Sequence, residues 1–78
     1  MINHDEELDT NGLKCPMPLL KTKKALALLD KNKVLRISAT DKNAVKDLQA
    51  FCDYTDHEFI THKELGDKNI YLIYIKKG

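Results

Sequence analysis

The spacing of hydrophobic residues changes several times along this 78-residue chain, and each change marks the boundary of a predicted element. Apolar residues recur at helical spacing in two segments, residues 16 to about 29 and residues 40 to about 54, which predicts two helices. Apolar and polar residues alternate in residues 34–39, which predicts a strand with its apolar side chains on one face. Further strands are predicted over residues 6–10, 57–64 and 69–76.

The resulting order, β-α-β-α-β-β, predicts the fold class. The Gly66-Asp67 pair favours a tight antiparallel connection between the last two strands. Residues 70–75 place apolar side chains on both faces of the last strand, which is typical of a central strand. We therefore expect an α/β two-layer sandwich in which two helices pack on one face of a four-stranded mixed sheet. A chain of this length buries only about 60% of its unfolded surface, so residues 1–78 are expected to form a single domain without an enclosed substrate chamber.

The first predicted helix combines a buried sector with an exposed one. The residues of the buried sector are Leu19, Thr22, Ala25, Leu26 and Leu29. Apolar and basic residues outside this sector form a stripe that leads away from Cys15, here called the exposed stripe. Its members are Met17, Leu20, Lys21, Lys23, Lys24 and Leu28. Docking of a transient partner on Met17, Leu20, Lys21 and Lys24 is one interpretation. A solvated face with incidental leucines explains the stripe equally well.

The second predicted helix has Thr40 or Asp41 as its candidate N-cap and carries Cys52 on its apolar side. Cys52 is therefore interpreted as a core residue and not as a resolving cysteine for Cys15. Two cysteines are too few for a disulfide scaffold, and they form no C-x-x-C pair. This disfavours thioredoxin-like exchange.

The candidate chemistry centres on Cys15, which lies between a turn that ends at Gly12 and a helix start that carries two prolines. A proline is well tolerated at the first helical position and restricts the residue before it, so we predict Cys15 at the N-cap and Pro16 at N1. Pro16 and Pro18 remove two amide donors and leave mainly the amides of Cys15 and Met17 near the sulfur.

This arrangement predicts a reactive thiol. The positive end of the helix dipole and the nearby Lys14 favour negative charge, so we expect the pKa of Cys15 to lie below the free value of about 8.5. The alternative is that Cys15 is a small capping residue and that the prolines only start the helix. Cysteine is a poor cap beside Ser, Thr, Asp or Asn, which favours the reactive thiol.

The Cys-Pro-x-Pro motif resembles that of the TusA/SirA-like family of small sulfur carriers, and the resemblance covers nearly the whole chain. The matching segments are residues 8–14 before the motif, 19–26 after it, Thr40-Asp41, 50–52 and 57–59. One departure is Lys42, where family members often have a proline; it affects helix initiation more than sulfur chemistry. In that family the motif cysteine carries sulfane sulfur as a persulfide, which implies this role for Cys15, supported by Gly12, Lys14, Pro16 and Pro18.

The resemblance also implies partners. The sulfur donor would be a cysteine desulfurase or a rhodanese-like protein, and a second protein would accept the sulfur for tRNA thiolation, sulfur oxidation or cofactor sulfuration. Transfer of sulfur between thiols needs no cofactor. We expect a monomeric sulfurtransferase-type carrier without an independent small-molecule active site.

Composition and spacing argue against several other functions. A formal charge of +1 and the lack of an aromatic and basic strip on the strands predict no direct nucleic-acid binding. No apolar run is long enough to span a membrane, and the acidic start does not resemble a secretion signal, which predicts a cytoplasmic protein. No Cys or His spacing resembles a metal site, since His57 and His62 point to opposite faces of a regular strand. No metal is therefore expected.

Two other classes stay open. The first is a noncatalytic interaction or regulatory module that docks through residues 16–28, with Cys15 incidental. The second is a thiol redox sensor, which needs a resolving cysteine near Cys15.

Overall fold

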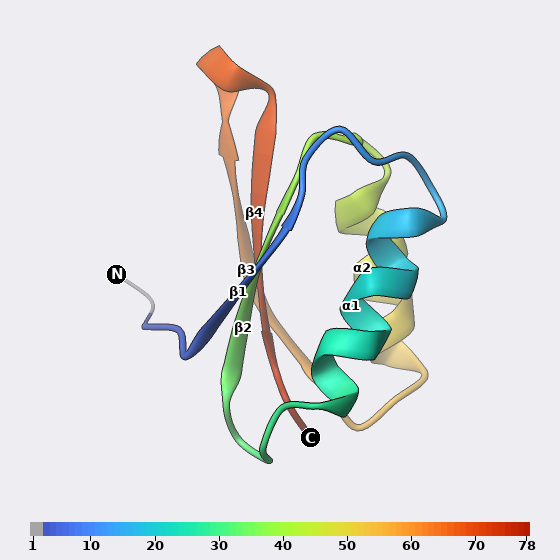
Figure 1. Ribbon diagram of the computed structural model, residues 1–78, viewed down its shortest axis with the longest axis vertical. Helices are drawn as coiled ribbons and strands as arrows, with labels where there is room; N and C mark the ends of the chain where they lie inside the picture. Colours follow the sequence, from blue (N-terminus) through green and yellow to red (C-terminus); the bar gives the residue numbers. More distant parts are fainter. Residues whose placement is uncertain (1–2) are drawn as a thin grey trace.

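The computed structural model describes residues 3–78 and contains a four-stranded sheet with two helices on one of its faces (Figure 1). The elements are β1 (Glu6–Thr10), α1 (Met17–Ala27), β2 (Val34–Ala39), α2 (Ala44–Asp53), β3 (Glu58–Leu65), a 3₁₀ turn (Gly66–Lys68) and β4 (Ile70–Lys76). The predicted two-layer sandwich and its β-α-β-α-β-β order are confirmed.

The sheet has the strand order β1-β2-β4-β3. β1 pairs with β2 in parallel, and β4 pairs antiparallel with both β2 and β3. β4 is therefore central, as its apolar side chains on both faces predict. Ile73 and Ile75 are completely buried, whereas Leu72 and Tyr74, which alternate with them along the strand, are half-buried.

The core lies between the sheet and the two helices. α1 contributes Leu26 and α2 contributes Leu48, both with no exposed surface. The alternating residues of β2 and β4 complete this core; they are Leu35, Ile37, Ala39, Ile73 and Ile75. Thr22 is the polar member of the buried side of α1, and its hydroxyl donates to the carbonyl of Pro18 at 2.8 Å. Cys52 is 6% exposed, which confirms its interpretation as a core residue.

Both helices begin later than the sequence predicts. Pro16 is the N-cap of α1, and Asn43, not Thr40 or Asp41, is the N-cap of α2. The reason at α2 is that the carboxylate of Asp41 has other partners: Oδ1 accepts from the amide of Asn43 at 3.0 Å, which forms a local turn ahead of the helix.

The β3–β4 hairpin departs from regular geometry at two points. β3 has a bulge between Phe59 and Thr61, and the strands are joined by the 3₁₀ turn followed by Asn69 in the left-handed region, with φ 52°. Asparagine tolerates this conformation better than most residues, which explains how the turn closes without a second glycine.

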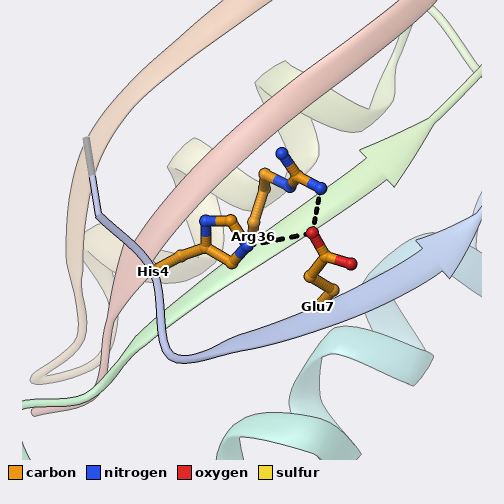
Figure 2. A network of polar contacts seen from close by, with 3 residues as sticks. All are labelled: His4, Glu7 and Arg36. Carbon is orange, nitrogen blue, oxygen red and sulfur yellow. Dashed lines mark hydrogen bonds and ion pairs between the residues drawn. The ribbon is translucent and has the colours of Figure 1, made fainter. Parts of the chain in front are cut away.

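A polar network fixes the segment before β1 on the sheet face that the helices leave uncovered (Figures 1 and 2). Glu7 accepts from Arg36, its register partner on β2, and also contacts Nε2 of His4 at 2.9 Å. The ring of His4 lies edge-on to that of Tyr74, with centroids 6.3 Å apart. Such exposed pairs typically contribute about 0.2–1 kcal/mol each, so this network orders the strand edge more than it determines stability.

Within residues 3–78, none of the helices combines the length and the apolar character that a bilayer crossing requires.

Candidate functional site

The thiol of Cys15 is exposed in the loop between β1 and α1. It lies one residue further from the helix than predicted, because Pro16 occupies the N-cap position and Met17 is the first helical residue. The two prolines therefore stand at N-cap and N2 and not at N1 and N3. The sulfur is still presented at the beginning of an α-helix.

The amides expected to face the sulfur have other acceptors. The amide of Cys15 donates to Oδ2 of Asp41 at 2.6 Å, and the amide of Met17 donates to the carbonyl of Lys14 at 2.8 Å. The prediction that these amides remain available to a thiolate is therefore wrong.

Hydrogen bonds instead hold the cysteine loop in place. Gly12 has φ 84°, a left-handed conformation that glycine adopts without strain, and its amide donates to the hydroxyl of Thr40 at 2.8 Å. The amide of Leu13 closes the turn onto the carbonyl of Thr10 at 3.1 Å. The Gly12–Thr40 and Cys15–Asp41 bonds connect the β1–α1 loop to the β2–α2 loop, and the two loops lie side by side in Figure 1.

The electrostatic environment of the thiol is opposite to the predicted one. The pKa of Cys15 is raised above its ordinary value, first by a hydrogen bond with the carboxylate of Asp47, then by partial desolvation and by the negative charges of Asp47 and Asp41. The expectation of a depressed pKa is therefore wrong. The negative charges beside the thiol come from Asp41, in the β2–α2 loop, and from Asp47, in the first turn of α2.

The charge of Lys14 affects the pKa of Asp41 and not, as expected, that of Cys15. Hydrogen bonds from the amides of Asn43 and Cys15 lower the pKa of Asp41, and the charges of Lys14 and Lys42 lower it further. Lys14 therefore favours the charged form of the carboxylate that accepts the amide of Cys15.

Cys52 is chemically distinct from Cys15. Burial, followed by the charge of Asp53, raises its pKa to about 11. A buried, protonated thiol is a poor nucleophile. Across residues 3–78 no group of three or more His, Cys, Asp or Glu side chains is arranged to hold a metal ion.

Cys15 lies where two open depressions meet. One, of about 780 Å³, is lined by the two loops and by Asn69 and Tyr71 from the β4 end of the hairpin. The other, of about 500 Å³, runs between the helices and is here called the interhelical groove. Its lining residues are Cys15, Leu19, Lys23, Asp47, Ala50, Phe51, Tyr54 and Thr55. Cys15 thus borders both depressions.

The exposed stripe forms a third depression of about 420 Å³ on the other side of α1. Met17 is 40% exposed, Leu20 48% and Leu28 82%. Lys21 and Lys24 line this depression with them, whereas Lys23 points away into the interhelical groove, its ammonium 5.7 Å from the ring centroid of Phe51. The structure therefore brings the four predicted docking residues together and separates Lys23 from them.

Comparison with known proteins identifies the family. The sequence model for sulfurtransferase TusA matches residues 6–77. The chain belongs to the TusA family. This TusA-family chain is 44% identical over 73 residues to the sulfur carrier protein TusA of Allochromatium vinosum, which covers 94% of this chain and 96% of that protein. It is 40% identical over 74 residues to the putative sulfur carrier protein YrkI of Bacillus subtilis, which covers 95% of this chain and 96% of that one.

A solved structure agrees in fold with this TusA-family chain. The SirA-like protein from Desulfitobacterium hafniense superposes with a TM-score of 0.81 at 24% identity, covering 95% of this chain and 99% of the other. The family model and the curated relatives confirm the family resemblance that the Cys-Pro-x-Pro motif carries, and the solved structure confirms the fold.

Sequence reasoning missed two carboxylates of the site. The sequence indicates only a capping role for Asp41 and no role for Asp47. A signal for Asp41 was present: β1 and β2 are parallel, so the loops that follow them must emerge at the same edge of the sheet. Asp47 has no comparable signal, because its approach to Cys15 depends on how the two helices pack.

Proposed function

We propose that this TusA-family protein is a sulfur carrier that holds sulfane sulfur as a persulfide on Cys15. The observation that carries the proposal is the exposed thiol, held at the beginning of α1 by hydrogen bonds to a second loop. Holding the thiol in one place reduces the conformational entropy lost in each transient encounter. Cys52 is unsuited to the role because it is buried.

The transfer proceeds between thiols and is balanced. Cys15 loses its proton to solvent, and its thiolate attacks the terminal sulfur of a donor persulfide. A new S–S bond forms on Cys15 while the S–S bond of the donor breaks, and the donor leaves as a thiolate that takes up a proton. Unloading repeats these steps with an acceptor thiolate as the attacking group. The raised pKa of Cys15 leaves less thiolate at neutral pH but makes that thiolate intrinsically more nucleophilic.

The donor and acceptor are proteins that reach the sulfur from outside. We propose a cysteine desulfurase or a rhodanese-like protein as donor, and an acceptor in tRNA thiolation, sulfur oxidation or cofactor sulfuration. Docking uses Met17, Leu20, Lys21 and Lys24, because this half-apolar, basic depression begins at the first helical residue after the thiol loop. The carrier acts as a monomer of one domain in the cytoplasm, where its exposed thiol is kept reduced.

Intact mass measurement tests the proposal. The chain is incubated with a cysteine desulfurase, its cofactor and cysteine, and its mass is compared before and after reduction. We expect a gain of one or more sulfur atoms that reduction removes. Cys15→Ser should gain none, and the matched Cys52→Ser variant should load as the unaltered chain does.

The same variants separate the alternatives. A folded Cys15→Ser chain that keeps its partner-dependent function would favour a docking module and contradict the carrier. A reversible Cys15–Cys52 disulfide would favour a redox sensor, but burial of Cys52 argues against it.

A further inference from the structure

The charges around the exposed stripe differ from those of the rest of the chain. Residues 10–29 contain four lysines and no acidic residue, although the whole chain has 13 Lys and Arg residues and 12 Asp and Glu residues. α1 therefore lacks the two arrangements by which charge usually stabilises a helix, an acidic first turn and Glu–Lys pairs one turn apart. Its lysines have no anion on their own helix.

Lys21 and Lys24 also have no ion-pair partner among the other side chains that the structure describes. The ion pairs in that part of the chain form at Asp5 and Glu7, with cations that lie outside α1. Both lysines are exposed, and they are three residues apart on the same face of α1, where like charges repel each other. An anion placed over this face would relieve the repulsion.

Apolar side chains share the face of these lysines. Met17, Leu20 and Leu28 recur at spacings of three and eight residues, which keeps them on one side of the helix, and they line the same depression as Lys21 and Lys24. Half-exposed methionine and leucine side chains gain free energy when another apolar surface covers them. The depression thus offers apolar contact and attraction for carboxylates in the same place.

The composition of this depression favours a protein over a nucleic acid as its occupant. Lysine also attracts phosphate, but single-stranded nucleic acids bind largely through bases that stack on aromatic side chains. None of the described residues that line the depression is aromatic. An amphipathic segment with carboxylates beside its apolar side chains matches both the charge and the apolar character of the surface, as in helix-in-groove recognition.

We propose that the exposed stripe binds an acidic amphipathic segment of the protein that exchanges sulfur with Cys15. Carboxylates of that segment pair with Lys21 and Lys24, and its apolar side chains fill the depression. The inference rests on the proposed function of Cys15 and adds the chemistry of the partner. Because the depression begins at Met17, two residues after Cys15, a partner bound there also reaches the loop that carries the thiol.

NMR titration of the ¹⁵N-labelled full chain tests this binding without any sulfur transfer. The probe is a synthetic amphipathic peptide with leucine and glutamate at helical spacing, and the control peptide carries lysine in place of glutamate. We expect the acidic peptide to shift the amide signals of residues 17–28 and the basic peptide to leave them unchanged. A single-stranded RNA oligonucleotide is the third probe and should bind more weakly than the acidic peptide.

Substitution of both lysines measures their share of the binding. In Lys21→Gln with Lys24→Gln, the Kd for the acidic peptide should rise about tenfold, the effect of losing two exposed ion pairs. The matched control is Lys46→Gln with Lys63→Gln, which removes the same charge from α2 and β3. Its Kd should stay within about twofold at about 0.1 M salt, where charges more than about 10 Å apart are screened. Lys21→Arg with Lys24→Arg keeps both charges and should bind as the unaltered chain does.

Absence of acidic-peptide binding, equal binding of the two peptides, or signal changes confined to residues outside 17–28 would overturn the inference. Tighter binding of the RNA would assign the lysines to a nucleic acid instead, and equal weakening by the two pairs of glutamine substitutions would contradict a role for this face. The carrier function fails separately. Cys15→Ser should bind the acidic peptide unchanged, whereas absence of sulfur uptake by the unaltered chain would contradict the carrier function alone.

Discussion

The amide of Cys15 donates a 2.6 Å hydrogen bond to Oδ2 of Asp41, a residue 26 positions further along the chain. This bond joins the loops that follow β1 and β2, which emerge at one edge of the sheet because the two strands are parallel. The other oxygen of Asp41 is bonded to the amide of Asn43. One carboxylate thus positions the thiol loop and shapes the start of α2.

Removal of this carboxylate should impair sulfur loading more than folding. In Asp41→Ala the amide of Cys15 loses its acceptor, and the thiol samples positions away from the one that partners meet. We expect loading from the same desulfurase to slow by about tenfold to hundredfold, since small misplacements of reacting atoms have effects of this size. The time course of intact mass measures it.

The matched control for this variant is Asp53→Ala, which removes an acidic side chain from the end of α2 without touching the thiol loop. Its loading rate should stay within about twofold of the unaltered rate, in the range of a surface substitution away from a structural feature. A comparable rate in Asp41→Ala would show that the thiol loop keeps its position without the bond.

The periodicity of apolar residues predicts the elements of the fold because these residues mark the buried face of each strand and each helix. The apolar residues on both faces of the last strand placed β4 in the centre, and the helical spacing placed Leu26 in the core. The exposure of Met17 and Leu20 followed from the same sector argument. These properties depend on residues close together in the chain.

The pKa of Cys15 depends on residues far apart in the chain, so the residues next to Cys15 in sequence predict a shift in the wrong direction. Helix dipole and Lys14 are near in sequence, whereas Asp47 reaches the thiol only through the packing of α2 beside α1. Similarly, aspartate is a residue type that commonly caps helices, but the carboxylate of Asp41 instead accepts the backbone amides of Cys15 and Asn43. Such competition is visible only in three dimensions.

The buried thiol of Cys52 should make stability depend on alkaline pH. Its native pKa is about 11, above the ordinary cysteine value of about 8.5, so its protonated form contributes stability that is fully present below about pH 8.5. That contribution is lost as pH rises toward 11, because the unfolded chain ionises first. The free energy of unfolding of the unaltered chain should therefore fall with pH more steeply than that of Cys52→Ala.

Urea unfolding at intervals from pH 7.5 to 11, under reducing conditions, measures this difference. Cys52→Val serves as a second control, because it also lacks a titrating group while filling more of the site. Both variants should show the same pH dependence despite different stabilities at pH 7.5. A constant gap between the unaltered chain and both variants would contradict the assignment to Cys52.

Docking on the exposed stripe predicts that Leu20→Glu slows sulfur transfer without changing the thiol. Leu20 is 48% exposed and lines the same depression as Lys21 and Lys24, so a carboxylate there adds charge to an apolar contact and offsets the basic one. Loss of a hot-spot residue at the centre of an interface costs about 2 kcal/mol or more, which corresponds to roughly thirtyfold in affinity. The concentration of donor needed for half-maximal loading should rise accordingly.

Lys31→Glu, a substitution in the loop after α1, serves as the control for added negative charge and should have little effect at physiological salt. Alkylation at Cys15 should be the same in both variants, and equal donor requirements for both would assign the leucines of the stripe to a solvated face.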